Sequence, residues 1–472
     1  DGDLDLYVAN YRTFTIRDQP GIKLRGSTID GKPQVMSVNG MSLEAANSVG
    51  RFTLNTNGKI LEHGQADRLY LNDGSGKFTP VSFTAGAFLD EDGQRLAKPP
   101  YDWGLSAMFR DMNRDGRPDL YVCNDFESPD RIWINQGQGV FRAIDRLAIR
   151  KSSHFSMGID FADLDRDGLD DFIVVDMLSR QHKLRHTQLS NRKAPELQFG
   201  VYNDRPQYSY NTVYLNNGDG TYAEMAYFSG VAASEWSWSS IFLDVDLDGW
   251  EDILITNGFE FDTDDLDTQA RISRLGNLGV AQKRKTIFLF PPLDTPNVAF
   301  RNLGNLRFEE VGAKWGFDDK HDGNGMALGD FDNDGDLDAV VSCLKGPALL
   351  YRNNAVAPRV AVRLAGSGKN TEGTGGRIRV ISALGQEPQS QEIMSGGRYV
   401  SGDQARRTFA ARTDKPFTIE VDWRDGTRTA LANAKAGRLY EIRQTGSQLI
   451  RPKNEVKQPF FADLSAQLGH EH

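Results

Sequence analysis

One nine-residue stretch decides the fold: Asp163-Leu164-Asp165-Arg166-Asp167-Gly168-Leu169-Asp170-Asp171, followed by the apolar run Phe172-Ile173-Val174-Val175. It places acidic or amide side chains at positions 1, 3, 5 and 9 and glycine at position 6. The pattern occurs four times in full, at 111–119, 163–171, 244–252 and 330–338. Repetition of this kind indicates an architecture built from similar supersecondary units.

A partial fifth copy opens the chain, where Asp1-Gly2-Asp3-Leu4-Asp5 aligns with the second half of the loop at 111–119. A folded domain is not expected to begin inside such a loop, so we expect the chain to be part of a longer one. The tail at 461–469 resembles 308–316, which introduces the last complete loop. This similarity predicts that another repeat unit starts near the C-terminus.

A hairpin signature follows each loop, in which asparagine and glycine separate alternating aromatic and aliphatic residues. The copies lie at 69–78, 132–141, 213–222 and 299–308, with a shortened one at 349–354. Asparagine and glycine supply the positive-φ positions of tight hairpins. A strand into the loop, a strand out of it and the hairpin give about four strands per unit, which is the content of a propeller blade. The predicted fold class is therefore all-β, a β-propeller with five visible blade units followed by a small β module.

The spacing of the acidic loop suits a hard cation. Oxygen ligands at positions 1, 3 and 5 converge on one centre, position 7 offers its backbone carbonyl, and the carboxylate at position 9 closes the shell. Such a set fits Ca²⁺ far better than Zn²⁺ or copper. An EF-hand would need glutamate at position 12 and flanking helices, but position 12 is Val122, Val174, Ile255 or Val341, inside a strand. A purely structural polar turn is the alternative, and four copies at the same positions argue against it.

We therefore predict about one Ca²⁺ for each of the four complete loops. The predicted ligands, with position 7 acting through its carbonyl, are Asp1, Asp3 and Asp5 in the partial loop; Asp111, Asn113, Asp115, Arg117 and Asp119; Asp163, Asp165, Asp167, Leu169 and Asp171; Asp244, Asp246, Asp248, Trp250 and Asp252; and Asp330, Asp332, Asp334, Asp336 and Asp338.

Composition excludes several classes of protein. The 472 residues include 65 acidic and 55 basic side chains, for a net charge of −10, which argues against nucleic-acid binding. The acidic excess is concentrated in the repeated loops, so it does not describe the whole surface. No run of about 18 apolar residues is present to span a membrane. Two cysteines, Cys123 and Cys343, exclude a disulfide framework and a cysteine-based zinc site, and free thiols are favoured over a bond between them.

The repeats divide the chain into regions. Residues 1–355 form the predicted propeller, 356–445 a β module with strands at 377–380, 418–421 and 439–442, and 446–472 a linker with the start of a further unit. Insertions at 11–66, 176–207 and 257–296 exceed ordinary loops, and long loops are commonly functional. Only 266–275 shows helical spacing.

Catalytic signatures are scarce, since no HExxH, GxSxG or Walker motif occurs. His182 and His186 have helical metal-ligand spacing, but a solvated role in a basic insertion is favoured. Trp236 and Trp238 alternate on one predicted strand, where core packing is favoured over a sugar-stacking platform. The acids at 262, 264, 265 and 267 form either a cation site or, preferably, a solvated acidic surface.

The loop-plus-hairpin units resemble FG-GAP/VCBS repeats, the calcium-binding blades of integrin α-subunit propellers; the entry Ser156-Met157-Gly158-Ile159-Asp160-Phe161-Ala162-Asp163 is typical of them. Residues 356–445 resemble the ASPIC/UnbV domain of cartilage acidic protein-like and bacterial secreted proteins. The resemblance lies in Gly373–Val380, Gly396–Ser401, Phe409 and Val421–Gly426. Ala410-Ala411-Arg412 and Arg424-Asp425-Gly426 replace the family's usual Gly-Leu-Gly and Pro-Ser-Gly.

These resemblances imply a calcium-loaded propeller, seven-bladed in the full protein, that is secreted, periplasmic or at the cell surface. Extracellular loops of this kind commonly need about 0.1–1 mM Ca²⁺. The function they favour is a binding or adhesion scaffold for a glycan or protein partner. A lyase-like enzyme acting on polysaccharide is the alternative, because calcium-loaded propellers of similar loop type resemble some rhamnogalacturonan lyases.

Overall fold

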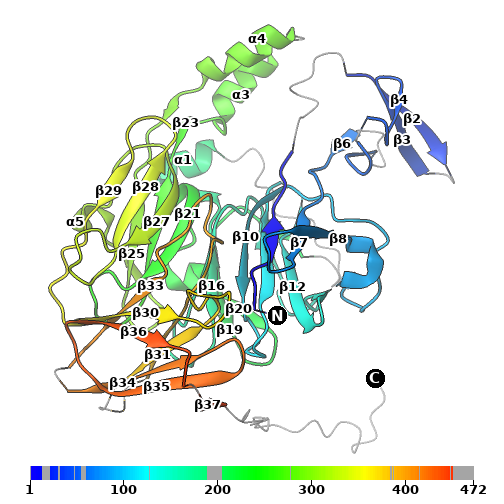
Figure 1. The fold of residues 1–472 in the computed structure, drawn as a ribbon. Helices are drawn as coiled ribbons and strands as arrows, with labels where there is room; N and C mark the ends of the chain where they lie inside the picture. The colour runs from blue at the N-terminus through cyan, green and yellow to red at the C-terminus, as the bar shows by residue number, and fades with distance from the viewer. Residues whose placement is uncertain are drawn as a thin grey trace, which may run out of the picture.

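A computed structural model describes residues 2–12, 22–29, 32–46, 48–54, 60–126, 128–188, 205–276, 278–382, 385, 387–413, 415–446 and 448–449. Strands dominate these residues and the helices among them are short (Figure 1). The predicted all-β class is confirmed. Asp1 and the tail similarity at 461–469 lie outside the described residues.

Five sheets, here called blades 1 to 5, follow one another along the chain. Blade 1 contains β1 (Leu6–Val8), β7 (Arg68–Asn72) and β8 (Phe78–Val81), and blade 2 contains β10 (Gly104–Arg110), β11 (Asp119–Asn124), β12 (Arg131–Gly137) and β13 (Val140–Ala143), with β9 (Phe88–Leu89) at its edge. Blade 3 contains β15 (Ile159–Ala162), β16 (Asp171–Val174), β19 (Thr212–Asn216) and β20 (Tyr222–Glu224). Blade 4 contains β21 (Glu235–Leu243), β22 (Asp252–Asn257), β25 (Val298–Asn302) and β26 (Phe308–Glu310), with β17 (Met177–Leu178) beside β21, and blade 5 contains β27 (Gly323–Gly329), β28 (Asp338–Cys343) and β29 (Leu349–Tyr351).

The acidic loop joins the first two strands of blades 2 to 5. In blade 3, β15 ends at Ala162 and β16 begins at Asp171, and these two residues pair across the sheet. The hairpin predicted from asparagine and glycine joins β19 to β20, with Asn216 opposite Tyr222. The predicted four-stranded unit is thus present in blades 2, 3 and 4.

Neighbouring blades touch through their first strands, since β10 contacts β15, β15 contacts β21, and β21 contacts β27. First strands of propeller blades line the central axis, so this is a propeller-like arrangement. Aromatic side chains fill the space between blades. Phe172 is fully buried, with its ring 5.3 Å from that of Tyr121 in blade 2 and 4.7 Å from that of Tyr214 in its own blade. Burying such rings contributes about 1.5–3 kcal/mol each.

The insertions form small structures of their own. The first contains β2 (Leu24–Ile29), β3 (Lys32–Val38), β4 (Met41–Ser42), β5 (Phe52–Leu54) and β6 (Ile60–Glu62). The third contains β23 (Phe259–Phe261), α3 (Leu266–Ser273), α4 (Val280–Lys285), the 3-10 turn η2 (Thr286–Leu289) and β24 (Pro292–Leu293). The helix expected from the spacing at 266–275 is confirmed as α3, and the Asp265 carboxylate caps it by accepting from the amide of Thr268 at 2.7 Å.

Short elements complete the blades. They are the π-turn η1 (Phe83–Ala87), the parallel pair β14 (Ser152–Ser153) and β18 (Gln207–Tyr208), α1 (His182–Thr187), α2 (Ala226–Ser229) and α5 (Gly312–Trp315). Both cysteines are free: Cys123 is buried in β11 and Cys343 is half-buried at the end of β28.

Two further sheets make up the C-terminal module. One contains β33 (Arg406–Ala410), β30 (Arg359–Ala365) and β36 (Arg438–Arg443); the other contains β32 (Gln389–Glu392), β31 (Arg377–Ile381), β34 (Phe417–Asp422), β35 (Thr427–Ala434) and β37 (Gln448–Leu449). The strands predicted at 377–380, 418–421 and 439–442 are confirmed. They enclose a core that includes Phe409 and Trp423.

The module packs against the end of the blades that carries the acidic loops (Figure 1). Its cations meet carboxylates of blades 1, 3 and 5: Lys369 with Asp3 at 3.6 Å, Arg377 with Asp170 at 2.5 Å, Arg359 with Asp334 at 2.9 Å, and Arg406 with Asp330 at 2.5 Å. The guanidinium of Arg412 lies 5.7 Å from the Trp250 ring in blade 4. The acidic face of the blades therefore matches a basic face of the module.

One segment of the module, residues 396–404, lies along the first strands of four blades; we call it the peg. Its contacts are Gly397 against Met108 in β10, Arg398 paired with Asp160 in β15, the Tyr399 ring 5.5 Å from that of Trp238 in β21, and the Ser401 hydroxyl donating to the Met326 carbonyl in β27 at 2.6 Å. The peg thus joins the module to the first strands of four successive blades.

The Arg398 side chain is 4 % exposed and also pairs with Asp403 at 2.8 Å. Replacing it in Arg398→Met leaves two buried carboxylates without their cation, which costs about 3–5 kcal/mol. We expect a matching loss in the free energy of unfolding by urea denaturation. The control is Arg363→Met, whose exposed partner is Glu441, with an expected loss of at most about 1 kcal/mol. Equal losses in the two variants would show that the peg does not anchor the module.

Candidate metal loops and an adjoining pocket

The first carboxylate of each complete loop accepts hydrogen bonds from backbone amides later in the same loop. In blade 4, Asp244 accepts from the amide of Asp248 at 3.0 Å and from that of Gly249 at 2.8 Å. Gly249 has φ +89°, in the left-handed region that favours glycine. Position 4 also has a positive φ, at Arg114, Arg166, Leu247 and Asn333. The predicted sharp turn at the glycine is confirmed.

The ninth carboxylate joins the loop to the hairpin. In blade 3, Asp171 accepts from the amide of Leu164 at 2.8 Å with one oxygen and from the amide of Asn216 at 2.9 Å with the other. The corresponding pairs of bonds recur at Asp119 with Met112 and Asn135, at Asp252 with Val245 and Asn302, and at Asp338 with Phe331 and Asn353. In the partial loop, Asp5 accepts from the amide of Asn72. This carboxylate therefore has a structural role, whatever it adds to a metal shell.

The hairpin asparagine makes the same hydrogen bonds in successive blades, which explains why loop and hairpin occur together. The Asn302 carboxamide donates to the Glu251 carbonyl at 3.1 Å and accepts from the amide of Gly304 at 2.9 Å. Asn72, Asn135 and Asn216 make the same pair of bonds in their own blades. The asparagine thus satisfies buried backbone groups at the loop exit.

Carboxylates converge in three of the loops. Oxygens within 4.8 Å of one another come from Asp163, Asp165 and Asp171; from Asp244, Asp246 and Asp248; and from Asp330, Asp332 and Asp338. One oxygen each of Asp163 and Asp246 is buried without a hydrogen-bond partner among the described residues. Hard oxygens in this number, with unpartnered buried oxygens among them, fit Ca²⁺.

Burial and nearby carboxylates disfavour the charged state of the first aspartate in the loops of blades 3 and 4. Burial raises the pKa of Asp163 to about 7, with Glu251 adding to the increase and Arg166 opposing it. Burial, followed by repulsion from Glu251 and Asp248, raises the pKa of Asp244 well above its ordinary range. A bound cation would relieve this repulsion.

The remaining predicted ligands are placed as follows. In blade 2, position 3 is the amide Asn113, and Asp115 forms an ion pair with Arg117. The position-7 residues Arg117, Leu169, Trp250 and Asp336 each donate their amide to the position-5 carboxylate of Asp115, Asp167, Asp248 or Asp334. In the partial loop, Asp3 lies near Lys369 of the module.

Sequence reasoning missed the arginines that meet these carboxylates. Arg301 contacts Asp246 at 2.5 Å and Asp248 at 2.6 Å, and Arg352 contacts Asp332 at 2.8 Å. A signal was present, because each of these arginines directly precedes the hairpin asparagine, where blades 1 to 3 have leucine or isoleucine. That register brings the side chain over the loop of its own blade.

The other sequence candidates differ in their surroundings, and the two histidines are exposed, as preferred from the sequence. His182 and His186 lie on α1 with their rings 4.4 Å apart, and no metal cluster among the described residues includes them. Trp236 stacks on Phe259 at 4.8 Å. The preferred solvated role of Asp262 is wrong, because Asp262 is buried and its carboxylate accepts from the side-chain carboxamide of Gln188 at 2.8 Å.

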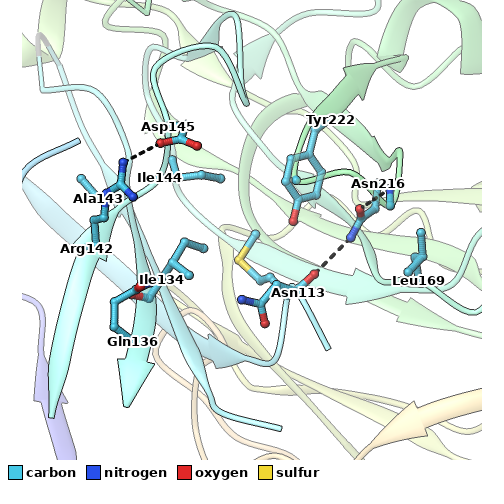
Figure 2. Close-up of a pocket in the computed structure, with 13 residues that line it drawn as sticks. Asn113, Ile134, Gln136, Arg142, Ala143, Ile144, Asp145, Leu169, Asn216 and Tyr222 are labelled. Carbon is cyan, nitrogen blue, oxygen red and sulfur yellow. Dashed lines mark hydrogen bonds and ion pairs between the residues drawn. The ribbon is translucent and has the colours of Figure 1, made fainter. Parts of the chain in front are cut away.

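A cavity of about 230 Å³ opens between blades 2 and 3, beside the loops at 111–119 and 163–171 (Figure 2). Apolar lining comes from residues such as Ile134 and Leu169, and polar lining from Asn113 and Gln136. Figure 2 shows the Tyr222 hydroxyl directed into the cavity. Burial and nearby carboxylates, led by Asp119, raise the pKa of Tyr222, so the hydroxyl stays protonated and can donate.

Comparison with known families identifies the two regions. The FG-GAP-like repeat profile matches residues 111–174 and 199–255, and the ASPIC and UnbV profile matches 366–449. The chain carries FG-GAP-like repeats and an ASPIC/UnbV domain. The resemblance drawn from the loops, hairpins and module motifs is thereby confirmed, and the acidic loops of blades 2, 3 and 4 belong to the FG-GAP-like repeats.

Among curated proteins, cartilage acidic protein 1 from Mus musculus is 34% identical over 115 residues, covering 24% of this chain and 18% of that protein. The Homo sapiens protein is also 34% identical over 115 residues, covering 24% of this chain and 17% of its own length. The chain thus spans less than a fifth of these relatives. Of solved structures, an Agrocybe aegerita lectin that recognises non-reducing terminal N-acetylglucosamine gives a TM-score of 0.24 at 12% identity, covering 71% of this chain and 80% of the lectin. A pilus-presented adhesin gives 0.13 at 9% identity, covering 93% and 98%.

Buried acids of the first FG-GAP-like unit predict a pH dependence. Burial raises the pKa of Asp130 and of Asp125 to about 7, whereas an unfolded aspartate titrates near 4. The folded state therefore holds protons that the unfolded state releases between about pH 4 and 7. In chelator, we expect the free energy of unfolding to fall as pH rises through this window, by up to about 1.4 kcal/mol per pH unit for each acid.

The slope of the free energy of unfolding against pH is measured by urea denaturation at several pH values. Asp130→Asn should reduce it, while Asp145→Asn, at a carboxylate that is 75% exposed, should leave it unchanged. An identical slope in all three proteins would contradict the assignment.

Proposed function

We propose that this protein is a calcium-loaded, extracellular binding scaffold that holds a saccharide between two FG-GAP-like blades. The observation that carries the proposal is that three carboxylates lie within 4.8 Å of one another in each of three loops. One buried oxygen of Asp163 and one of Asp246 also lack a hydrogen-bond partner among the described residues. Calcium suits such oxygens, and extracellular fluid supplies it. Kinship with cartilage acidic protein 1 and the family match support a location outside the cytosol. No helix in the described residues is long and apolar enough to cross a membrane.

Calcium should stabilise the blades by binding the folded state. At a concentration one hundred times Kd, one site contributes about 2.7 kcal/mol. We therefore expect a higher melting temperature in millimolar Ca²⁺ than in chelator, and about four ions per chain by isothermal titration calorimetry. No change in melting temperature together with no titration heat would contradict calcium binding.

Two variants of one loop separate metal binding from structural bonding. Asp246→Asn with Asp248→Asn removes two converging carboxylates and should lower the stoichiometry by one ion while retaining stability in chelator. Asp252→Asn instead weakens the bonds to the amides of Val245 and Asn302, and should cost about 1–3 kcal/mol even in chelator.

The inter-blade cavity is the proposed saccharide site. Its volume of about 230 Å³ and its mixed lining suit one sugar ring, whose faces are apolar and whose edge carries hydroxyls. The Tyr222 hydroxyl has no hydrogen-bond partner within the described part of the chain and is directed into the cavity (Figure 2). The carboxamides of Asn113 and Gln136 supply further donors and acceptors.

Titration with neutral hexoses and N-acetylhexosamines, followed by saturation-transfer NMR, tests this site. Tyr222→Phe removes only the hydroxyl, and we expect it to weaken binding about tenfold. The control Tyr208→Phe lies outside the cavity and should bind as wild type. Absence of binding to every sugar, or equal binding by Tyr222→Phe, would refute the site. Ultraviolet-absorbing unsaturated products from uronic polymers would instead indicate lyase activity.

A further inference from the structure

The insertion between β22 and β25 forms a helical arm, residues 266–289, that extends away from the blades (Figure 1). Its base is fixed by backbone pairing of β23 with β24 and by a bond from the Asp262 amide to the Pro291 carbonyl at 2.8 Å. Gln269 donates to the Thr263 carbonyl at 2.8 Å. The arm is therefore positioned by the scaffold while most of its surface is exposed.

Charge is segregated on this arm. Five cationic side chains lie between 271 and 285, and the sequence from 268 to 293 contains no acidic residue. All five are exposed: Arg271, Arg274, Lys283, Arg284 and Lys285. In a chain with a net charge of −10, this cluster is a local site of positive potential.

Large apolar side chains accompany the cations. Leu275 is 53 % exposed, Phe288 71 % and Leu289 39 %. The Phe288 ring meets Phe261 edge-on at 5.8 Å, which holds the ring in place without covering it. Phe288 and Leu289 are neighbours in the chain, and adjacent exposed apolar side chains of this size mark an interaction surface.

Cationic and apolar side chains also lie close together along the chain of the arm. Leu275 directly follows Arg274, in the turn just beyond the end of α3 at Ser273. Phe288 follows Arg284 by four residues and Lys285 by three, where α4 continues into η2. Side chains three residues apart lie on the same side of a 3-10 turn, so Lys285 and Phe288 are placed together where α4 continues into η2.

We infer that the arm docks on an anionic phospholipid surface. Cations attract the headgroups, and exposed apolar side chains gain by entering the boundary between headgroups and acyl chains. A hydrated polyanion would satisfy the cations but would leave Leu275 and Phe288 in water. The inference is independent of the saccharide site, which lies between blades 2 and 3.

Vesicle co-sedimentation of the full chain tests the inference, with phosphatidylcholine vesicles and with vesicles containing one quarter phosphatidylserine. In chelator and 0.1 M salt, we expect binding only to the anionic vesicles, weakening as salt rises. Arg284→Gln with Lys285→Gln should reduce binding about tenfold or more, because each cation near such a surface contributes appreciably. Phe288→Ser should also reduce it at unchanged charge.

Matched controls are Lys77→Gln with Lys314→Gln, which removes two exposed cations elsewhere, and Leu350→Ser, which removes an exposed apolar side chain of β29. Both should bind as wild type, and unchanged melting temperatures confirm folding of all variants. The inference is overturned by absence of binding, by binding that requires Ca²⁺, or by controls that fail equally. Competition by dextran sulfate with no effect of Phe288→Ser would indicate a polyanion site, and self-association through the arm without vesicle binding would indicate a second copy.

Discussion

Blades 2 to 5 depend on one buried carboxylate at the ninth position of each complete acidic loop. At Asp171 and Asp252, each oxygen accepts from a different backbone amide, one at the start of the loop and one in the hairpin. A single side chain thus fixes the loop to the third strand of its blade. Any cation held by the first, third and fifth positions would bind a loop that is already closed, so metal affinity and blade folding can be tuned by different residues.

Charge also decides how the module meets the blades. Burial alone would raise the pKa of Asp170, but its ion pairs with Arg110 and Arg377 lower this pKa far below the ordinary range. Arg110 belongs to blade 2 and Arg377 to the module, so Asp170 joins these two parts to its own blade. Glu392 of β32 lies within 3.7 Å of Arg110. Removing one member would leave buried charge uncompensated. The acidic loops are consequently part of an internal boundary as well as candidate metal sites.

Local features of this fold follow from sequence, and long-range ones do not. The glycine at position 6, the asparagine hairpins and the strands after each loop are encoded within a few residues, so spacing predicts them. The arginine pairs are different: Arg398 meets Asp160 across more than two hundred residues, and Gly396-Gly397 reads only as a turn. The burial of Asp262 was not predicted, because its acidic neighbours in the sequence indicate a solvated surface. The side-chain carboxamide of Gln188, which donates to the Asp262 carboxylate, lies in another insertion of the chain. The spacing of the acids within each loop predicts that their carboxylates converge. The inter-blade cavity could not be predicted in this way, because it depends on how two separate blades pack against each other.

The peg gives the molecule a mechanical property. Because residues 396–404 contact the first strands of blades 2 to 5, tension applied to the module would be shared among four sheets instead of acting on the single covalent connection after β29. Shearing the peg would require the Arg398 pair and the Ser401 bond to break together with the Tyr399–Trp238 contact. Because these contacts would be loaded in parallel, the module would resist separation from the blades better than any one of the contacts alone.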